Sequence, residues 1–172
     1  MTRQSPHTGF TLIELIVVIV ILGILGIAVA PRFQGPDGYT EYAAQTRLIA
    51  ALRQMQVRAM HDARTAYCHQ IVFDTDSSPP QFGVAIADFA QANATASCQS
   101  SILPTAAMSF TLDKGLSMSA QDGSTTISSL GFNHLGQALS SSGQCLAGCQ
   151  IDFSGESTVS VCVNQEGYIR AC

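Results

Sequence analysis

Six cysteines are the residues of this 172-residue chain with the most evident chemistry. Thiolates bind zinc, and Cys145-x3-Cys149 with His134 nearby presents zinc-type ligands. An even number of cysteines, all C-terminal to a long apolar run, is instead typical of disulfides formed in an oxidising compartment. We therefore predict disulfides and no metal site. The cysteines are Cys68, Cys98, Cys145, Cys149, Cys162 and Cys172.

The other reactive side chains form no catalytic pattern. The acids Asp74, Asp76, Asp113 and Asp122 lack the spacing of a calcium loop. The histidines, His7, His61, His69 and His134, have no neighbours typical of a catalytic triad, and the serine-rich stretches lack a G-x-S-x-G elbow. An enzyme is the least expected class, and we predict no cofactor.

Glu14 is the single charged residue in a 21-residue apolar run over residues 10–30. As a helix this run would be about 31 Å long, enough to cross a bilayer. A carboxylate at the bilayer centre costs about 2.5–3.5 kcal/mol, so such a residue usually has a partner. We predict a membrane-spanning helix in which Glu14 is paired. The alternative is that Glu14 lies unpaired at headgroup depth.

The residues before this run, MTRQSPHTG, contain Arg3 and the initiating amine. The positive-inside rule predicts that they stay in the cytoplasm and that the rest of the chain lies outside. A secretory signal would have a shorter apolar region followed by a small-residue cleavage site, which this run lacks.

The stretch GFTLIE at residues 9–14, followed by the apolar run, resembles the type III signal of type IV pilins and pseudopilins. The resemblance implies that a prepilin peptidase cleaves after Gly9 and methylates the new N-terminus at Phe10. The product has 163 residues (172 − 9). It also implies that Glu14 pairs with the terminal amine of a neighbouring subunit, and that Pro31 kinks the helix as in many family members.

Shorter stretches in the rest of the chain suggest a subgroup. They are RLIAALRQMQVRAM, CHQ, QFGVA and VCVNQEGYIRAC. Together they resemble MshC-type minor pilins of the mannose-sensitive haemagglutinin (MSHA) pilus. The GspH-type pseudopilins of type II secretion have a comparable helix-then-strands layout and are the nearest alternative.

Helical periodicity predicts a second helix over residues 39–64 with one apolar face. That face comprises Leu48, Ile49, Leu52, Met55, Ala59, Met60 and Ala63. The arginines lie outside it, either solvated or docking another subunit: Arg47, Arg53, Arg58 and Arg64.

Beyond this helix the pattern changes to short strands separated by turn residues. The predicted strands are 70–74, 82–87, 108–112, 116–119, 126–130, 150–153, 158–163 and 167–171, and the last three form an antiparallel meander. Residues 91–101 are expected to form a loop. Candidate disulfides are Cys149–Cys162 across the hairpin and Cys68–Cys98 across a loop.

The predicted fold class is α+β, a long N-terminal helix packed on antiparallel sheet, as in pilins. The leader is residues 1–9, the membrane and filament-core helix 10–30, the kink or linker 31–38, and the globular domain 39–172. The glycines and proline at 35–38 leave open whether the helix continues.

We expect a structural subunit of a filament, anchored in the inner membrane and later extracellular. Its expected partners are the prepilin peptidase, other pilins and the assembly platform of the inner membrane. The formal charge of −4 and the absence of a basic stripe beyond residues 47–64 argue against nucleic acid. Alternatives are a pseudopilin of a secretion system, an adhesin, or a DNA-uptake subunit.

Overall fold

The computed structural model describes residues 11–29, 39–62, 69–85 and 101–172. The chain divides into two units, Met1–Asp37 and Gly38–Cys172. Pro31 and the glycines near residues 35–38 lie outside the described residues, so the predicted kink and the continuity of the helix there stay predictions.

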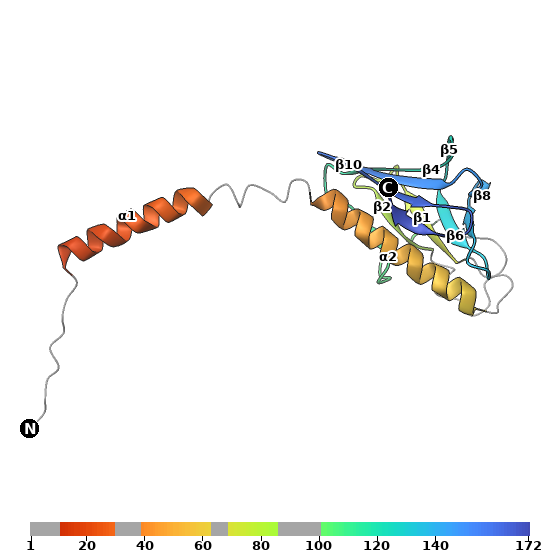
Figure 1. Cartoon of the computed structure of the whole chain (residues 1–172), viewed down its shortest axis with the longest axis horizontal. Coiled ribbons are helices and arrows are strands. Elements are labelled where there is room, and N and C mark those ends of the chain that lie inside the picture. The colour runs from red at the N-terminus through yellow and green to blue at the C-terminus, as the bar shows by residue number, and fades with distance from the viewer. Residues whose placement is uncertain (1–10, 30–38, 63–68, 86–100) are drawn as a thin grey trace, which may run out of the picture. The chain divides into compact units, whose positions relative to one another are not determined.

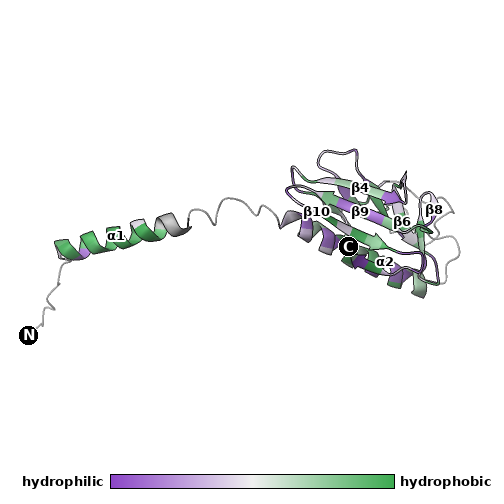
Figure 2. Ribbon diagram, turned by 45° about the horizontal axis from the view of Figure 1, so that its top comes forward, coloured by the Kyte–Doolittle hydropathy of each residue, from purple (hydrophilic) through white to green (hydrophobic). Residues whose placement is uncertain are grey.

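The first unit contains helix α1, Leu12–Val29. Its Leu, Ile and Val side chains leave no polar face, and hydrophobic residues dominate it in Figure 2. The helix has 18 residues, whereas the predicted run has 21, and both ends of that run lie outside the described residues. Within the described ranges, no helix reaches the length and hydropathy required of a membrane span.

The second unit contains helix α2, Thr40–His61, followed by strands β1 to β11. Figure 1 shows α2 running along one side of the strands. The strands are β1 Gln70–Asp74, β2 Gln81–Val84, β3 Phe110–Thr111, β4 Ser117–Asp122, β5 Thr125–Thr126, β6 Ser129–Phe132, β7 Ala138–Ser140, β8 Gly143–Gln144, β9 Cys149–Ser154, β10 Thr158–Val163 and β11 Ile169–Ala171.

The strands form two antiparallel sheets where the sequence suggested one. The six-stranded sheet has the order β3-β2-β1-β6-β7-β8, and the five-stranded sheet has the order β11-β10-β9-β4-β5. The predicted terminal meander is confirmed, because β9, β10 and β11 pair in sequence. The predicted strand at 126–130 is wrong as a single element. Its residues divide between β5 in one sheet and β6 in the other.

The core lies between α2 and the two sheets. Leu48, Leu52, Met55 and Ala59 of the predicted apolar face are buried in it, beside Phe82 and Phe153 from different sheets. The ring centroids of Phe82 and Phe153 are 6.0 Å apart, so the two sheets are in contact within the core. Met60 was predicted on the buried face but is 46% exposed, because it lies in line with the partly buried Ile49 on the flank of the apolar stripe.

Candidate functional site

The first turn of α1 contains the residue with the strongest functional prediction, Glu14. The backbone N–H of Glu14 donates to the Thr11 hydroxyl at 3.4 Å, and the Thr11 N–H donates to Glu14 Oε2 at 3.4 Å. The Thr11 hydroxyl also lies 3.5 Å from the same carboxylate oxygen. These reciprocal bonds form a capping box, in which a Thr and a Glu three residues later satisfy each other's free backbone donors.

The position of Glu14 explains how an apolar helix tolerates a carboxylate. The first turn of a helix presents unpaired N–H groups and a partial positive charge, and both favour an anion. The cap thus gives Glu14 partners inside its own chain, and it directs the carboxylate toward the N-terminal end of α1. Sequence reasoning singled out Glu14 but missed Thr11, although T-x-x-E ahead of an apolar run is the signature of this cap.

The side chains of α1 whose burial is described are all exposed. From Leu12 to Leu25 the large apolar residues range from 43% exposed at Ile16 to 76% at Leu12. A continuous apolar surface of this kind needs apolar surroundings, either lipid or other apolar helices.

A known family model matches the N-terminus of the chain. The prokaryotic N-terminal methylation motif covers residues 5–30, which include Gly9, Phe10, the capping box and the apolar run. The N-terminal segment of the chain is pilin-like. No curated protein and no solved structure matches it. The motif supports a type IV pilin or pseudopilin subunit of the cell envelope, and it favours a structural role over an enzymatic one.

Two of the predicted site residues in this pilin-like segment, Gly9 and Phe10, lie outside the described residues. The cleavage and methylation sites therefore stay predictions that the motif match supports.

Two disulfides close the C-terminal part of the domain. Cys145 pairs with Cys149, and Cys162 pairs with Cys172. The expected Cys149–Cys162 pair is wrong, because Cys149 lies opposite Val163 and points into the core, whereas Cys162 lies opposite Gln150 on the other face of the sheet. Cys68 and Cys98 lie outside the described residues, so their pairing stays a prediction.

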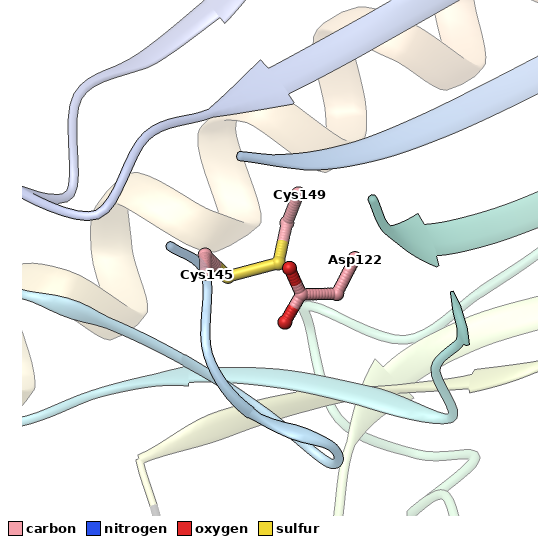
Figure 3. A group of neighbouring side chains, drawn as sticks. All are labelled: Asp122, Cys145 and Cys149. Carbon is pink, nitrogen blue, oxygen red and sulfur yellow. A yellow bond between two sulfur atoms is a disulfide. The ribbon is translucent and has the colours of Figure 1, made fainter. Parts of the chain in front are cut away.

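The possible metal ligands Cys145 and Cys149 are joined to each other by their sulfur atoms, with the Asp122 carboxylate beside them (Figure 3). Neither sulfur is a thiolate, so this group lacks the donors that zinc requires. Asp122 Oδ2 instead accepts hydrogen bonds from the hydroxyls of Ser140 at 2.8 Å and Ser142 at 3.1 Å. These hydrogen bonds connect the end of β7 and the β7–β8 turn to the end of β4.

Two arginines of α2 have partners within the second unit. The Arg47 guanidinium carbon lies 5.6 Å from the centre of the Phe110 ring, a cation–π contact at the edge of the six-stranded sheet. Arg53 donates to the carbonyl of Ile169 at 3.3 Å, at the edge of the five-stranded sheet. These two contacts hold the flanks of the helix to its own domain, so neither Arg47 nor Arg53 is merely solvated.

Sequence reasoning missed a buried carboxylate, Glu41, at the start of α2. Its side chain is 1% exposed, and Oε1 accepts a hydrogen bond from the Ser157 N–H at 3.1 Å in the β9–β10 turn. The Thr40 hydroxyl donates to Oε2 at 3.1 Å. The bond from Ser157 is the main reason that the pKa of Glu41 lies below its ordinary value of 4.5. Glu41 thus fixes the first turn of α2 to a hairpin 116 residues away.

The lowered pKa of Glu41 predicts a particular loss of stability in acid. A carboxylate with a depressed folded-state pKa stabilises the fold above its unfolded pKa, and this stabilisation disappears as pH falls through the folded pKa. We expect the urea midpoint of the wild-type chain to fall more steeply below about pH 4.5 than that of Glu41→Gln. Glu156→Gln, which removes an exposed carboxylate from the same turn, is the control. Parallel curves for wild type and Glu41→Gln would contradict the role of the ionised side chain.

Proposed function

We propose that the chain is a minor pilin of an MSHA-like type IV pilus. It is inserted in the inner membrane by residues 10–30, cleaved after Gly9, methylated at Phe10, and then drawn into an extracellular filament. The observation that carries this proposal is the methylation motif over residues 5–30, together with a capped helix that is apolar apart from Glu14 and whose described side chains are exposed.

The exposed surface of α1 supports two successive roles for one segment. Before assembly, lipid would cover the apolar side chains, with the leader in the cytoplasm and the second unit in the periplasm. After assembly, the same side chains would pack against α1 helices of other subunits. The partners in this proposal are the prepilin peptidase, neighbouring pilins and the assembly platform of the inner membrane.

Glu14 would pair with the methylated terminal amine of a neighbouring subunit. Within an apolar filament core, an unpaired carboxylate and an unpaired ammonium are each costly, and pairing them removes both penalties. The capping box supports this role, because it turns the Glu14 carboxylate toward the N-terminal end of the helix, where such an amine would approach.

A GspH-type pseudopilin of a type II secretion system is the second candidate. In the described residues of the second unit, one helix is followed by strands, and this order favours a pseudopilin as much as it favours a minor pilin. Deletion of the chain separates the two, since a minor pilin deletion reduces surface pili and a pseudopilin deletion reduces secretion of exported proteins.

The test of the proposed function is co-expression of the full chain with a prepilin peptidase. Intact mass and N-terminal sequencing of the membrane-extracted product are expected to give a chain that begins at Phe10 and carries one methyl group. Gly9→Leu should leave the chain uncut, because a bulky side chain replaces hydrogen next to the cleaved bond. Gly23→Ala, a substitution within the apolar run that meets no atom within 4 Å, should be cut normally. A wild-type chain that still begins at Met1 would contradict the proposal.

A further inference from the structure

A hollow of about 300 Å³ lies at one end of the five-stranded sheet, between the Cys145–Cys149 loop and the β10–β11 turn. Its lining includes Gln150, Asn164, Tyr168 and Arg170. Tyr168 and Arg170 flank the buried Ile169, so both side chains are directed to the solvent side of the sheet. The volume is at the low end of the range for small-molecule sites, which suits one ring of a ligand.

The walls of this hollow are fixed before any ligand arrives. One wall is the loop closed by the Cys145–Cys149 disulfide, and the Cys162–Cys172 disulfide ties β10 to the residue after β11. The turn between β10 and β11 is closed by two bonds, from Asn164 N–H to the Tyr168 carbonyl at 3.2 Å and from Tyr168 N–H to Asn164 Oδ1 at 2.7 Å. Because these walls are already ordered, a ligand that binds between them causes little loss of conformational entropy in the protein.

The hydrogen bonds inside the domain leave a specific set of groups available to a ligand. Asn164 uses its carbonyl oxygen on Tyr168, so its NH₂ is left to donate. Gln150 uses its NH₂ on Asp152 at 2.8 Å, so its carbonyl oxygen is left to accept. Within the described residues, the exposed Arg170 guanidinium pairs with no carboxylate, and the Tyr168 ring is 64% exposed.

We propose that this hollow binds an acidic saccharide, a sugar ring that carries a carboxylate. The face of Tyr168 would cover the apolar C–H face of the ring, and Arg170 would hold the carboxylate through paired N–H bonds. The amides of Asn164 and Gln150 offer one donor and one acceptor, which suits hydroxyl groups. A phosphate is less well matched, because the hollow offers one cation and gives no use to the tyrosine face.

The experiment uses the full chain in detergent micelles. The chain has no tryptophan, so Tyr168→Trp introduces a single tryptophan, which can be excited selectively and preserves an aromatic face in the hollow. Digalacturonate is titrated as the probe. The uncharged galactose disaccharide, inorganic phosphate and an acidic peptide are each titrated separately for comparison. Calorimetry of digalacturonate with the wild-type chain measures the same binding without the substitution.

The expected result is a saturable change in fluorescence with digalacturonate. Affinity should be at least about tenfold weaker for the uncharged disaccharide, because it lacks the charge-assisted bond to Arg170. Arg170→Gln added to Tyr168→Trp should cause a similar loss, and Tyr168→Ala should lose about tenfold in the calorimetric affinity. Lys114→Gln removes an exposed cation from a different hollow, whose lining includes no aromatic residue. It should leave the affinity for digalacturonate unchanged.

A second tryptophan position gives the specificity control. Tyr42 is 54% exposed on α2, and Tyr42→Trp should show no response to digalacturonate. The proposal is overturned if neither fluorescence nor calorimetry detects saturable binding, or if Arg170→Gln binds as tightly as its parent. It is equally overturned if phosphate or the acidic peptide binds more tightly than digalacturonate.

Discussion

Replacing Glu14 with glutamine is expected to leave the chain in membranes and to lower its recovery in sheared filaments on the order of a hundredfold. Loss of one partner from a buried charge pair costs about 3–5 kcal/mol, and each 1.4 kcal/mol is about a factor of ten in an equilibrium. Insertion should persist, because removal of a charge makes residues 10–30 more apolar. The measurement is the ratio of chain in sheared filaments to chain in membranes, determined by immunoblot.

The glutamine substitution separates the helix cap from the proposed charge pair with a neighbouring subunit. Glutamine at the third helical position still completes a capping box with Thr11, but it carries no charge. Thr11→Val is the matched variant, since it keeps the Glu14 charge and removes the hydroxyl that caps the helix. Thr11→Ser restores a capping hydroxyl.

The two roles of Glu14 then give different results. If the charge is paired in the filament, Glu14→Gln fails to assemble, while Thr11→Val suffers a smaller loss that Thr11→Ser rescues. Recovery of Glu14→Gln in filaments at the wild-type level would contradict the charge pair. Glu14 would then act only as a helix cap. Glu14→Ala loses both contacts and should be no better than Glu14→Gln.

Gly167→Ala is expected to destabilise the folded domain by roughly 2–4 kcal/mol, a large share of the usual stability of a domain. Gly167 has a φ of +84°, a conformation that favours glycine. An added methyl group would also overlap the carbonyl oxygen of Gly136 and approach Gln56 Nε2. Those groups cannot easily move apart, because Gln56 Nε2 donates to the carbonyls of Gly136 at 2.9 Å and Gly167 at 2.8 Å.

A second glycine provides the control for backbone conformation. Gly115 has a φ of +94°, but a methyl group there meets nothing within 4 Å. Gly115→Ala should therefore cost only the conformational penalty, about 1–2 kcal/mol. Urea unfolding followed by far-UV circular dichroism gives both values. Equal losses for the two variants would show that the contact between the Gly136 and Gly167 turns contributes nothing beyond local strain.

The sequence alone was sufficient for the features that depend on local patterns. The apolar run, Glu14 and the motif at residues 9–14 lie in one short stretch, so the signal that the motif match supports needs no tertiary information. Helix α2 was predicted from its periodicity, and four residues of its apolar face are buried. Strand β10 was predicted with its observed bounds, because β-branched residues alternate along it between turn signals.

The two-sheet arrangement and the disulfide pairing were decided by tertiary structure. In the β9–β10 hairpin, the expected Cys149–Cys162 pair misses the observed register by one residue, since Cys149 lies opposite Val163. A one-residue slip moves a side chain to the other face of a sheet, so a pairing inferred from separation along the chain is easily wrong. The short strands β7 and β8 were missed because they carry little β-branched or aromatic signal.

Long-range polar contacts were likewise beyond the reach of the sequence. Glu41 appears as an ordinary acid in the first turn of a helix, and nothing local indicates that the Ser157 N–H donates a hydrogen bond to it. The hollow around Tyr168 and Arg170 exists only because the Cys145–Cys149 loop folds beside the β10–β11 turn. Local patterns determine which segments are helix or strand, whereas the faces on which distant residues meet depend on register and packing, which form only when the whole domain closes.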